Sequence, residues 1–241
     1  SLLVALACAP LMQAPAQAQV DVGKASVMRQ LVPAETLENS ATQQYQELLQ
    51  QSKAKGALVD GNNAQLQRIR AIAQRLIQYA AQWNPRASQW KWEVNLIASK
   101  QINAFCMPGG KIAFYTGIID QLKLTDDEIA MIMGHEMAHA LREHSREQLA
   151  KNQATSIGIS LGAQLLGLGD IGNTAARLGG QLLSLKFSRN DESDADLVGL
   201  ELAARAGYNP QAAVSLWRKM GEATGEGGIG FLSTQPTGPD R

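Results

Sequence analysis

Two of the three histidines in this 241-residue chain stand four residues apart, in the segment HEMAH that begins at His135. Four residues of an α-helix turn through about 400°, so His135 and His139 would lie one above the other on a single face. Two imidazoles placed in this way can each offer a nitrogen to one Zn²⁺ ion. Glu136 would lie about 100° further round the helix, where its carboxylate can act as a general base on a metal-bound water. The segment therefore predicts two zinc ligands with a base beside them.

The pentapeptide alone is not specific, because two buried core histidines and a surface glutamate would give the same letters. A zinc site needs a third ligand from elsewhere in the chain. His144 lies nine residues after His135, half a turn away on an unbroken helix, so we predict that it faces solvent. Glu192 and Asp196 are also four residues apart and would share one face of a second helix. We therefore predict Glu192 as the third ligand and Asp196 as the acceptor of a ring N–H from a ligand histidine.

The helices that must position these residues follow from capping signals and hydrophobic spacing. Thr125, with Glu128 three residues later, forms a capping box at the start of a helix that we predict to run to about Lys151. On the second helix, Asp191 and Asp194 fall on other faces, where we expect them to supply N-terminal charge and solvation. Further helices or helical regions are predicted over about 35–55, 64–83, 191–206 and 212–220.

The segment before the HEMAH helix has the pattern of strands. Apolar residues alternate with polar ones over about 90–96, as in a half-buried strand. Two more strands, 104–107 and 111–115, flank the turn signal Pro-Gly-Gly. We expect a small antiparallel sheet within a mainly α-helical α+β fold.

The first 18 residues have the apolar core and the small-residue cleavage site of a secretory signal peptide whose basic start is missing. We expect cleavage after Ala18, export to a periplasm or to the outside of the cell, and an extended leader over residues 19–34. Lipid attachment at Cys8 is the alternative. Because Cys8 would leave with the signal, Cys106 would have no disulfide partner, and we expect it to be a small buried apolar residue.

Charge and hydropathy exclude some partners. The 22 Lys and Arg residues balance the 22 Asp and Glu residues, which gives no electrostatic reason to expect nucleic acid or an anionic membrane. Residues 156–185 are apolar and rich in glycine, but Asp170 and Arg177 interrupt them, so neither half reaches the roughly 20 residues of a membrane span. We expect two buried or lid-forming helices there; a surface that engages unfolded chains or a membrane is the alternative.

Beyond the pentapeptide, three longer segments carry a family resemblance. These are INAFCMPGGKIAFYTGII (102–119), LTDDEIAMIMGHEMAHALREHS (124–145) and FSRNDESDADLVGLELAARAGYNP (187–210). Together they resemble the gluzincin family of HtpX-type, Oma-type and CAAX prenyl protease-type metallopeptidases, particularly its soluble periplasmic members of the BepA and LoiP type. The resemblance covers most of the chain from Glu35 onward and implies a zincin-like metallopeptidase domain over residues 35–232.

The resemblance implies roles for individual residues. His135, His139 and Glu192 would bind one Zn²⁺ ion, Glu136 would be the general base, and Asp196 would orient His135. An extended substrate would lie along an edge strand at Asn103, Ala104 and Phe105.

The last ten residues, LSTQPTGPDR, resemble a family segment near the metal, but they depart from it at one position. Gln235 stands where the family has a histidine that could stabilise the oxyanion or occupy the open metal position. Arg241 matches the family's arginine, and we interpret residues 233–241 as the start of a C-terminal active-site segment that continues beyond this chain.

The resemblance implies a zinc endopeptidase that cleaves extended or misfolded cell-envelope proteins, while the residues themselves indicate only a peptide substrate. Such an enzyme would bind polypeptides and could associate peripherally with a membrane or with outer-membrane assembly machinery. Gln235 and the apolar region 156–185 motivate an alternative: a weakly active or inactive zinc-bound chaperone or assembly factor.

Overall fold

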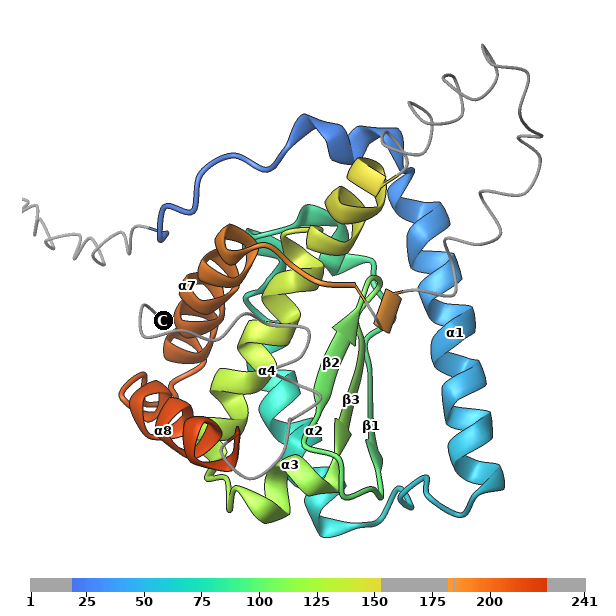
Figure 1. Ribbon diagram of the computed structural model, residues 1–241, viewed down its shortest axis with the longest axis vertical. Coiled ribbons are helices and arrows are strands. Elements are labelled where there is room, and N and C mark those ends of the chain that lie inside the picture. The colour runs from blue at the N-terminus through green and yellow to red at the C-terminus, as the bar shows by residue number, and fades with distance from the viewer. Residues whose placement is uncertain (1–18, 153–181, 184, 225–241) are drawn as a thin grey trace, which may run out of the picture.

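The computed structural model describes residues 19–152, 182–183 and 185–224 (Figure 1). The expected signal peptide, nearly all of the apolar region 156–185, and the positions Gln235 and Arg241 lie outside these residues. Within them the protein is mainly helical, with one small sheet, as the sequence predicts. The helices are α1 (Ala34–Ala54), α2 (Ala64–Ile77), α3 (Thr116–Gln121), α4 (Asp126–Leu141), α7 (Arg189–Arg205) and α8 (Ala212–Thr224).

The three strands are β1 (Glu93–Ile97), β2 (Ala104–Met107) and β3 (Lys111–Tyr115), in the order β1-β3-β2. The expectation of an all-antiparallel sheet is wrong for one pair, because β1 pairs with β3 in parallel while β2 and β3 are antiparallel. Successive strands do reverse direction, but β3 returns between the other two, so the first and third strands become parallel neighbours. The tight β2–β3 turn relies on two glycines in the left-handed region, Gly109 at φ +81° and Gly110 at φ +76°.

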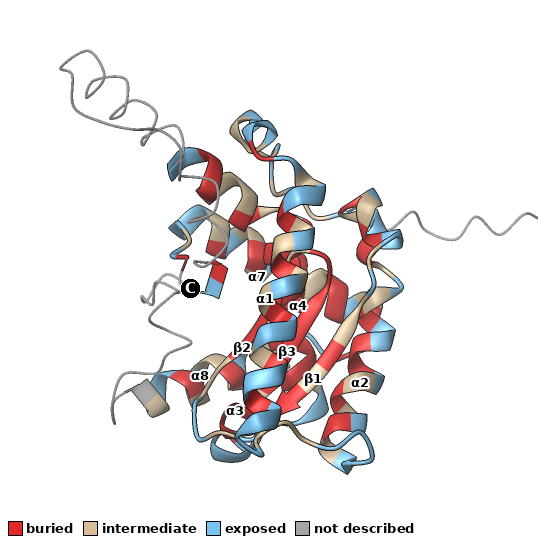
Figure 2. Ribbon diagram, turned by 90° about the vertical axis from the view of Figure 1, so that its right-hand side faces the viewer, coloured by how far each residue is buried: buried red, intermediate tan, exposed pale blue. Residues whose placement is uncertain are grey.

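The two faces of the sheet belong to two different cores. Cys106 and Ile112 face α2 and α4, whereas their neighbours Phe105 and Ala113 pack against α1, which follows from the two-residue period of a strand. Figure 1 shows α4 between the sheet and α7, with α1 on the opposite side of the sheet. Figure 2 shows that β2 and β3 are largely buried and β1 is partly buried, while α1 is exposed on its outer face.

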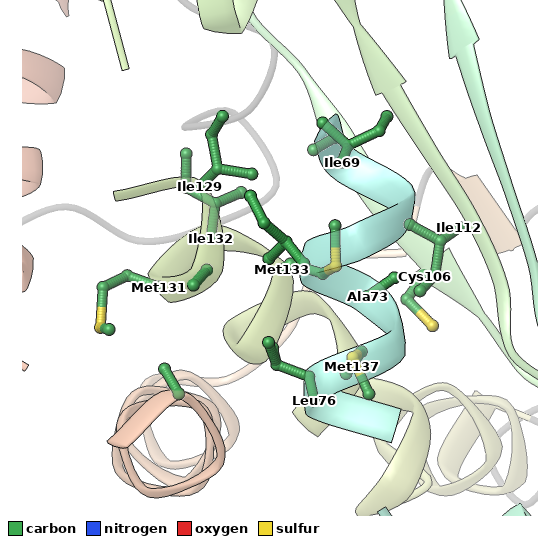
Figure 3. Packing of buried hydrophobic residues seen from close by; sticks show 14 of the residues in the cluster. Ile69, Ala73, Leu76, Cys106, Ile112, Ile129, Met131, Ile132, Met133 and Met137 are labelled. Carbon is green, nitrogen blue, oxygen red and sulfur yellow. The ribbon is translucent and has the colours of Figure 1, made fainter. Parts of the chain in front are cut away.

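Helix α2 packs directly against α4. Figure 3 shows this contact, and the apolar side chains that meet there are Ile69, Ala73, Leu76, Met133 and Met137. The sequence predicted a longer helix, to Trp83, but α2 ends at Ile77 and the chain continues as 3₁₀ helices over Ala80–Gln82 and Pro85–Ser88. Asn84 caps the second of these 3₁₀ helices, because its side chain accepts from the amide of Arg86, and it also donates to the carbonyl of Leu141 on α4.

The leader is not wholly extended, since it contains a 3₁₀ helix over Val27–Leu31. It lies against the helices of the domain: the amide of Val20 donates to Glu201 of α7 at 2.6 Å, and Arg142 donates to the carbonyl of Gly23 at 3.1 Å. Among the residues that the structure describes, no helix is long and apolar enough to cross a membrane.

Candidate metal centre

Helix α4 carries the HEMAH segment through the middle of the domain. Thr125 and Glu128 form the predicted capping box at its start, and every residue from Glu128 to Leu141 is buried. A helix that is buried on all sides should be apolar on all sides, yet three of its residues are His135, Glu136 and His139. Buried polar groups are costly unless they find partners, so these side chains need a specific function or a specific set of contacts.

The sequence-predicted ligands meet at one point. His135 and His139 are 5% and 3% exposed, and Glu192, in the first turn of α7, is 1% exposed. The two Nε2 atoms are 3.1 Å apart, and each lies 3.6 Å from a carboxylate oxygen of Glu192. Atoms bound tetrahedrally at about 2.0–2.2 Å from an ion are separated by roughly 3.3–3.6 Å. The three side chains therefore have the spacing that a single metal ion requires, and they form a candidate metal site.

The opposite nitrogen of each imidazole has its own partner. Nδ1 of His135 lies 2.9 Å from Oδ1 of Asp196. Asp196 was predicted to accept a ring N–H from one of the two histidines. A neutral imidazole that donates from Nδ1 has a lone pair at Nε2. If both histidines donate in this way, two lone pairs face each other across 3.1 Å, an arrangement that a cation between them would stabilise.

His144 lies at the site, which contradicts the prediction that it faces solvent. Helix α4 ends at Leu141 instead of continuing to Lys151, because Glu143 adopts the left-handed conformation at φ 60° before residues 144–152 resume a helix. The break turns His144 inward, where it is buried and its Nδ1 lies 3.0 Å from Nδ1 of His139. Burial is the main reason why the pKa of His144 falls to about 4, so it is a neutral partner at ordinary pH.

The ring of Phe187 completes the surroundings of His139. The two rings are stacked, with centroids 4.1 Å apart and planes inclined by 22°. His139 is therefore held on its face by Phe187 and at its edge by His144. The contact with Phe187 was not predicted, because that residue lies just before α7 and far from α4 in the chain.

The two acidic residues on the other faces of α7 have different surroundings. Asp191 caps the helix as expected, forming a capping box with Ser188. Asp194 is not simply solvated, since one of its oxygens lies 3.1 Å from Nη2 of Arg142. Burial raises the pKa of this carboxyl above its ordinary value despite the arginine beside it. Asp194 thus ties α7 to the turn that follows α4.

Two glycines allow α4 and α7 to approach closely enough for these contacts. A Cβ atom added at Gly134 would lie 2.5 Å from the carbonyl oxygen of Gly199, and one added at Gly199 would lie 2.5 Å from the backbone nitrogen of His135. Any larger residue would push the helices apart and carry Glu192 away from the histidines. Neither glycine was predicted to lie at the site. The available signal was a glycine inside each helix, which costs about 1 kcal/mol relative to alanine and so suggests a packing reason.

Glu136 lies on the side of α4 that faces the sheet. The nearby sulfur is that of Cys106 on β2, whose pKa is raised well above its ordinary value by burial and, secondarily, by the charge of Glu136. Cys106 is buried and free of any disulfide, as expected. The predicted base is thus next to the predicted ligands and adjacent to β2.

Strand β2, where the predicted substrate-binding residues lie, is at an edge of the sheet. Ala104 and Phe105 are buried, and the ring of Phe105 packs edge-on against Tyr45 of α1 with centroids 6.4 Å apart. The carbonyl of Asn103 accepts from the amide of Tyr115. The side chain of Phe105 is therefore part of the core, and any role of this strand in substrate binding would fall to its backbone.

Comparison with known proteins identifies the family. The model of peptidase family M48 matches residues 63–241, which include the whole candidate metal centre. The chain belongs to this family. An M48 chain with two histidines and a glutamate at one point is consistent with the metal dependence of the family's peptidases.

Individual relatives of this M48 chain come from mitochondria and from bacteria. The mitochondrial metalloendopeptidase OMA1 of Arabidopsis thaliana is 39% identical over 150 residues, covering 62% of this chain and 30% of the relative. The beta-barrel assembly-enhancing protease of Yersinia pestis is 26% identical over 167 residues, covering 65% of this chain and 32% of the relative. The metalloprotease LoiP of Escherichia coli K12 is 26% identical over 179 residues, covering 71% and 65%. The chain spans less than two thirds of the length of each of these relatives.

Proposed function

We propose that this protein is a zinc-dependent endopeptidase. The observation that carries the proposal is the meeting of His135, His139 and Glu192 at ligand spacing, with Glu136 next to the first ligand. Membership of a metallopeptidase family supports it. Two imidazoles and one carboxylate are a donor set that suits zinc and leaves a fourth position for water or substrate.

The chain's own residues have distinct tasks in this reaction. When bound, the ion supplies polarisation of the scissile carbonyl and acidifies water. Glu136 accepts a proton from the attacking water as the new carbon–oxygen bond forms, and it returns that proton to the nitrogen as the carbon–nitrogen bond breaks. Asp196 and His144 hold the two imidazoles so that their Nε2 atoms point at the same place.

We further propose that the substrates are extended or misfolded proteins of the cell envelope. An edge strand beside a metal site favours an extended polypeptide, because backbone hydrogen bonds can bind many sequences. The expected signal peptide supports a periplasmic location. The names of the relatives indicate two different locations, since the Yersinia protein is named for β-barrel assembly and the OMA1 proteins are mitochondrial. A link to outer-membrane assembly machinery is part of this proposal.

The decisive experiment compares the parent chain with Glu136→Gln and with the control Glu47→Gln, which changes an exposed residue of α1. Zinc content and hydrolysis of an unfolded protein are measured for each. We expect equal zinc in all three and a loss of about 10²–10⁴-fold in rate for Glu136→Gln alone, as for removal of a general base.

Two outcomes would contradict the proposal. Retained hydrolysis in Glu136→Gln would show that this residue is not the base. A parent chain that binds zinc but cleaves nothing, even after Gln235→His, would favour the alternative of a zinc-bound chaperone or assembly factor. Suppression of aggregation of the same unfolded protein would then be the activity to measure.

A further inference from the structure

Phe187 lies in the short segment that leads into α7, immediately before the capping residue Ser188. Figure 1 shows this segment, in orange, entering α7 from the side of the sheet. Glu192 follows Ser188 by four residues, which is about one helical turn. Phe187 therefore lies where the chain passes from the sheet to the helix that carries the third ligand.

The ring of Phe187 is close to two imidazoles. Its centroid is 4.1 Å from that of His139, with planes inclined by 22°, and 6.1 Å from that of His144, with planes inclined by 56°. Aromatic pairs commonly have centroids 4.5–7 Å apart, so the approach to His139 is a near one. The face of the Phe187 ring is thus directed at the ligand histidine and not at its neighbour.

This contact should become stronger when a metal ion is bound. An imidazole that gives a nitrogen lone pair to a divalent cation loses electron density and carries part of the positive charge. The face of a benzene ring is negative and attracts a cation that lies within about 6 Å of its centroid. His139 is 3% exposed, so water screens this attraction little. The stacked ring would therefore favour the metal-bound form of His139.

The other surroundings of Phe187 hold the ring in place. Phe187 packs against the hydrophobic core between α1 and the sheet, which also contains Leu185, two residues earlier in the same segment. Leu185 is 6% exposed, so the segment is anchored directly before the ring. A ring that is already ordered loses little conformational entropy when the metal binds. Its attraction for the imidazole can therefore contribute almost entirely to the affinity.

We propose that Phe187 is a positioning residue of the metal centre, whose ring face orients His139 and stabilises its metal-bound form. This role rests on the proposed zinc binding and adds to it a residue that is neither a ligand nor a hydrogen-bond partner of a ligand. Apolar packing alone would depend on the size of the ring, whereas the proposed role depends on its π electrons.

The first experiment changes the electrons of the ring and leaves its size almost constant. Phenylalanines that carry one, two or three fluorine atoms are incorporated at position 187 of the full chain, and zinc Kd is measured by competition with a chelator. Each fluorine withdraws electron density from the ring face, so Kd should rise stepwise. We expect a total rise of about 5–30-fold, the factor that corresponds to a buried cation–π contact. A Kd that does not change along the series would overturn the proposal.

The second experiment uses natural residues. Phe187→Leu keeps an apolar side chain without the ring face and should weaken zinc binding by a similar factor of about 5–30. Phe187→Tyr keeps the ring face and should bind zinc as the parent does. The control Leu185→Ala leaves a cavity in the same core and should lower the Tm of the metal-free chain without changing zinc Kd. If it weakens zinc binding as much as Phe187→Leu does, core packing accounts for the effect and the proposal is wrong.

A spectroscopic measurement reports on the orientation of His139. Co²⁺ is added to each metal-free chain, and its visible absorption bands are recorded, because their position and intensity depend on the geometry of the ligands. We expect Phe187→Leu to change these bands, while Phe187→Tyr and Leu185→Ala keep those of the parent. Identical bands in Phe187→Leu and the parent would show that the ring does not position His139. A parent chain that binds neither zinc nor Co²⁺ would instead contradict the proposed function.

Discussion

The two ligand histidines are held by partners of different charge. His135 donates to the carboxylate of Asp196, whereas His139 meets the imidazole of His144, whose lowered pKa keeps it neutral. A carboxylate partner increases the basicity of the ligand histidine, while a neutral partner mainly fixes its orientation. His135 is therefore expected to be the more basic of the two imidazoles in this site.

His144→Ala should weaken zinc binding by about 10–100-fold, the usual cost of losing such an orienting partner. His144→Asn, which keeps an acceptor near Nδ1 of His139, should recover part of that loss. Competition with a chelator of known affinity measures both values, and an unchanged Kd in His144→Ala would show that the contact at 3.0 Å does not position His139.

A spacing of four placed His135 and His139 on one helix face and Glu192 and Asp196 on another. The meeting of the two faces was predicted from the need for a third ligand and from the family resemblance. The prediction failed at His144 because nothing local marks the end of α4. The turn at Glu143 is supported by ion pairs with Arg29 at 3.1 Å and with Arg146 at 3.0 Å. Arg29 is distant in the sequence, so this support becomes visible only in the folded chain.

At the level of elements, the contact between Gly134 and Gly199 sets the distance between α4 and α7. Each helix contributes part of the ligand set, so the spacing of the ligands depends on how closely the two backbones approach. Helical periodicity predicts which residues share a face but not which faces meet. For the same reason, alternation predicted β1 and a turn signal predicted β2 and β3, but neither predicted the parallel pairing of β1 with β3.

Gly199→Ala should lower the free energy of unfolding by about 1–3 kcal/mol, the typical cost of overpacking, and should also weaken zinc binding. Gly221→Ala is the matched control, because a Cβ atom at that position of α8 meets nothing within 4 Å. Urea denaturation of the metal-free chains and zinc titration of the folded ones give the two quantities. If Gly199→Ala and the control have the same free energy of unfolding and the same zinc affinity, the close approach of α4 and α7 does not determine the spacing of the ligands.

For the whole molecule, the metal centre joins two helices that are separated by a long stretch of sequence. The two imidazoles and the carboxylate are buried, and Glu192 is 1% exposed. A buried carboxylate beside two imidazoles lowers the stability of the folded state unless a cation binds between them. A ligand that binds only the folded state stabilises it, by about 2.7 kcal/mol at one hundred times its Kd. We therefore expect metal binding to stabilise the folded state of this protein.

Removal of the metal by a chelator should lower the Tm, and returning zinc should restore it. Glu192→Gln removes a charged ligand and should make the Tm nearly independent of zinc. Differential scanning calorimetry of both chains, with and without chelator, provides the test. A parent Tm that does not respond to the chelator would mean that the three side chains do not hold an ion in the folded protein.

The leader and the ligand His139 are connected through a short series of contacts. Arg29 of the leader pairs with Glu143, Arg146 donates to the carbonyl of Val32, and the turn at Glu143 aims His144 at His139. Tension or displacement applied at the leader would thus reach an imidazole of the metal centre through only two side-chain contacts. A change in the position of the leader is therefore expected to move His144 and, through it, to change the orientation of His139.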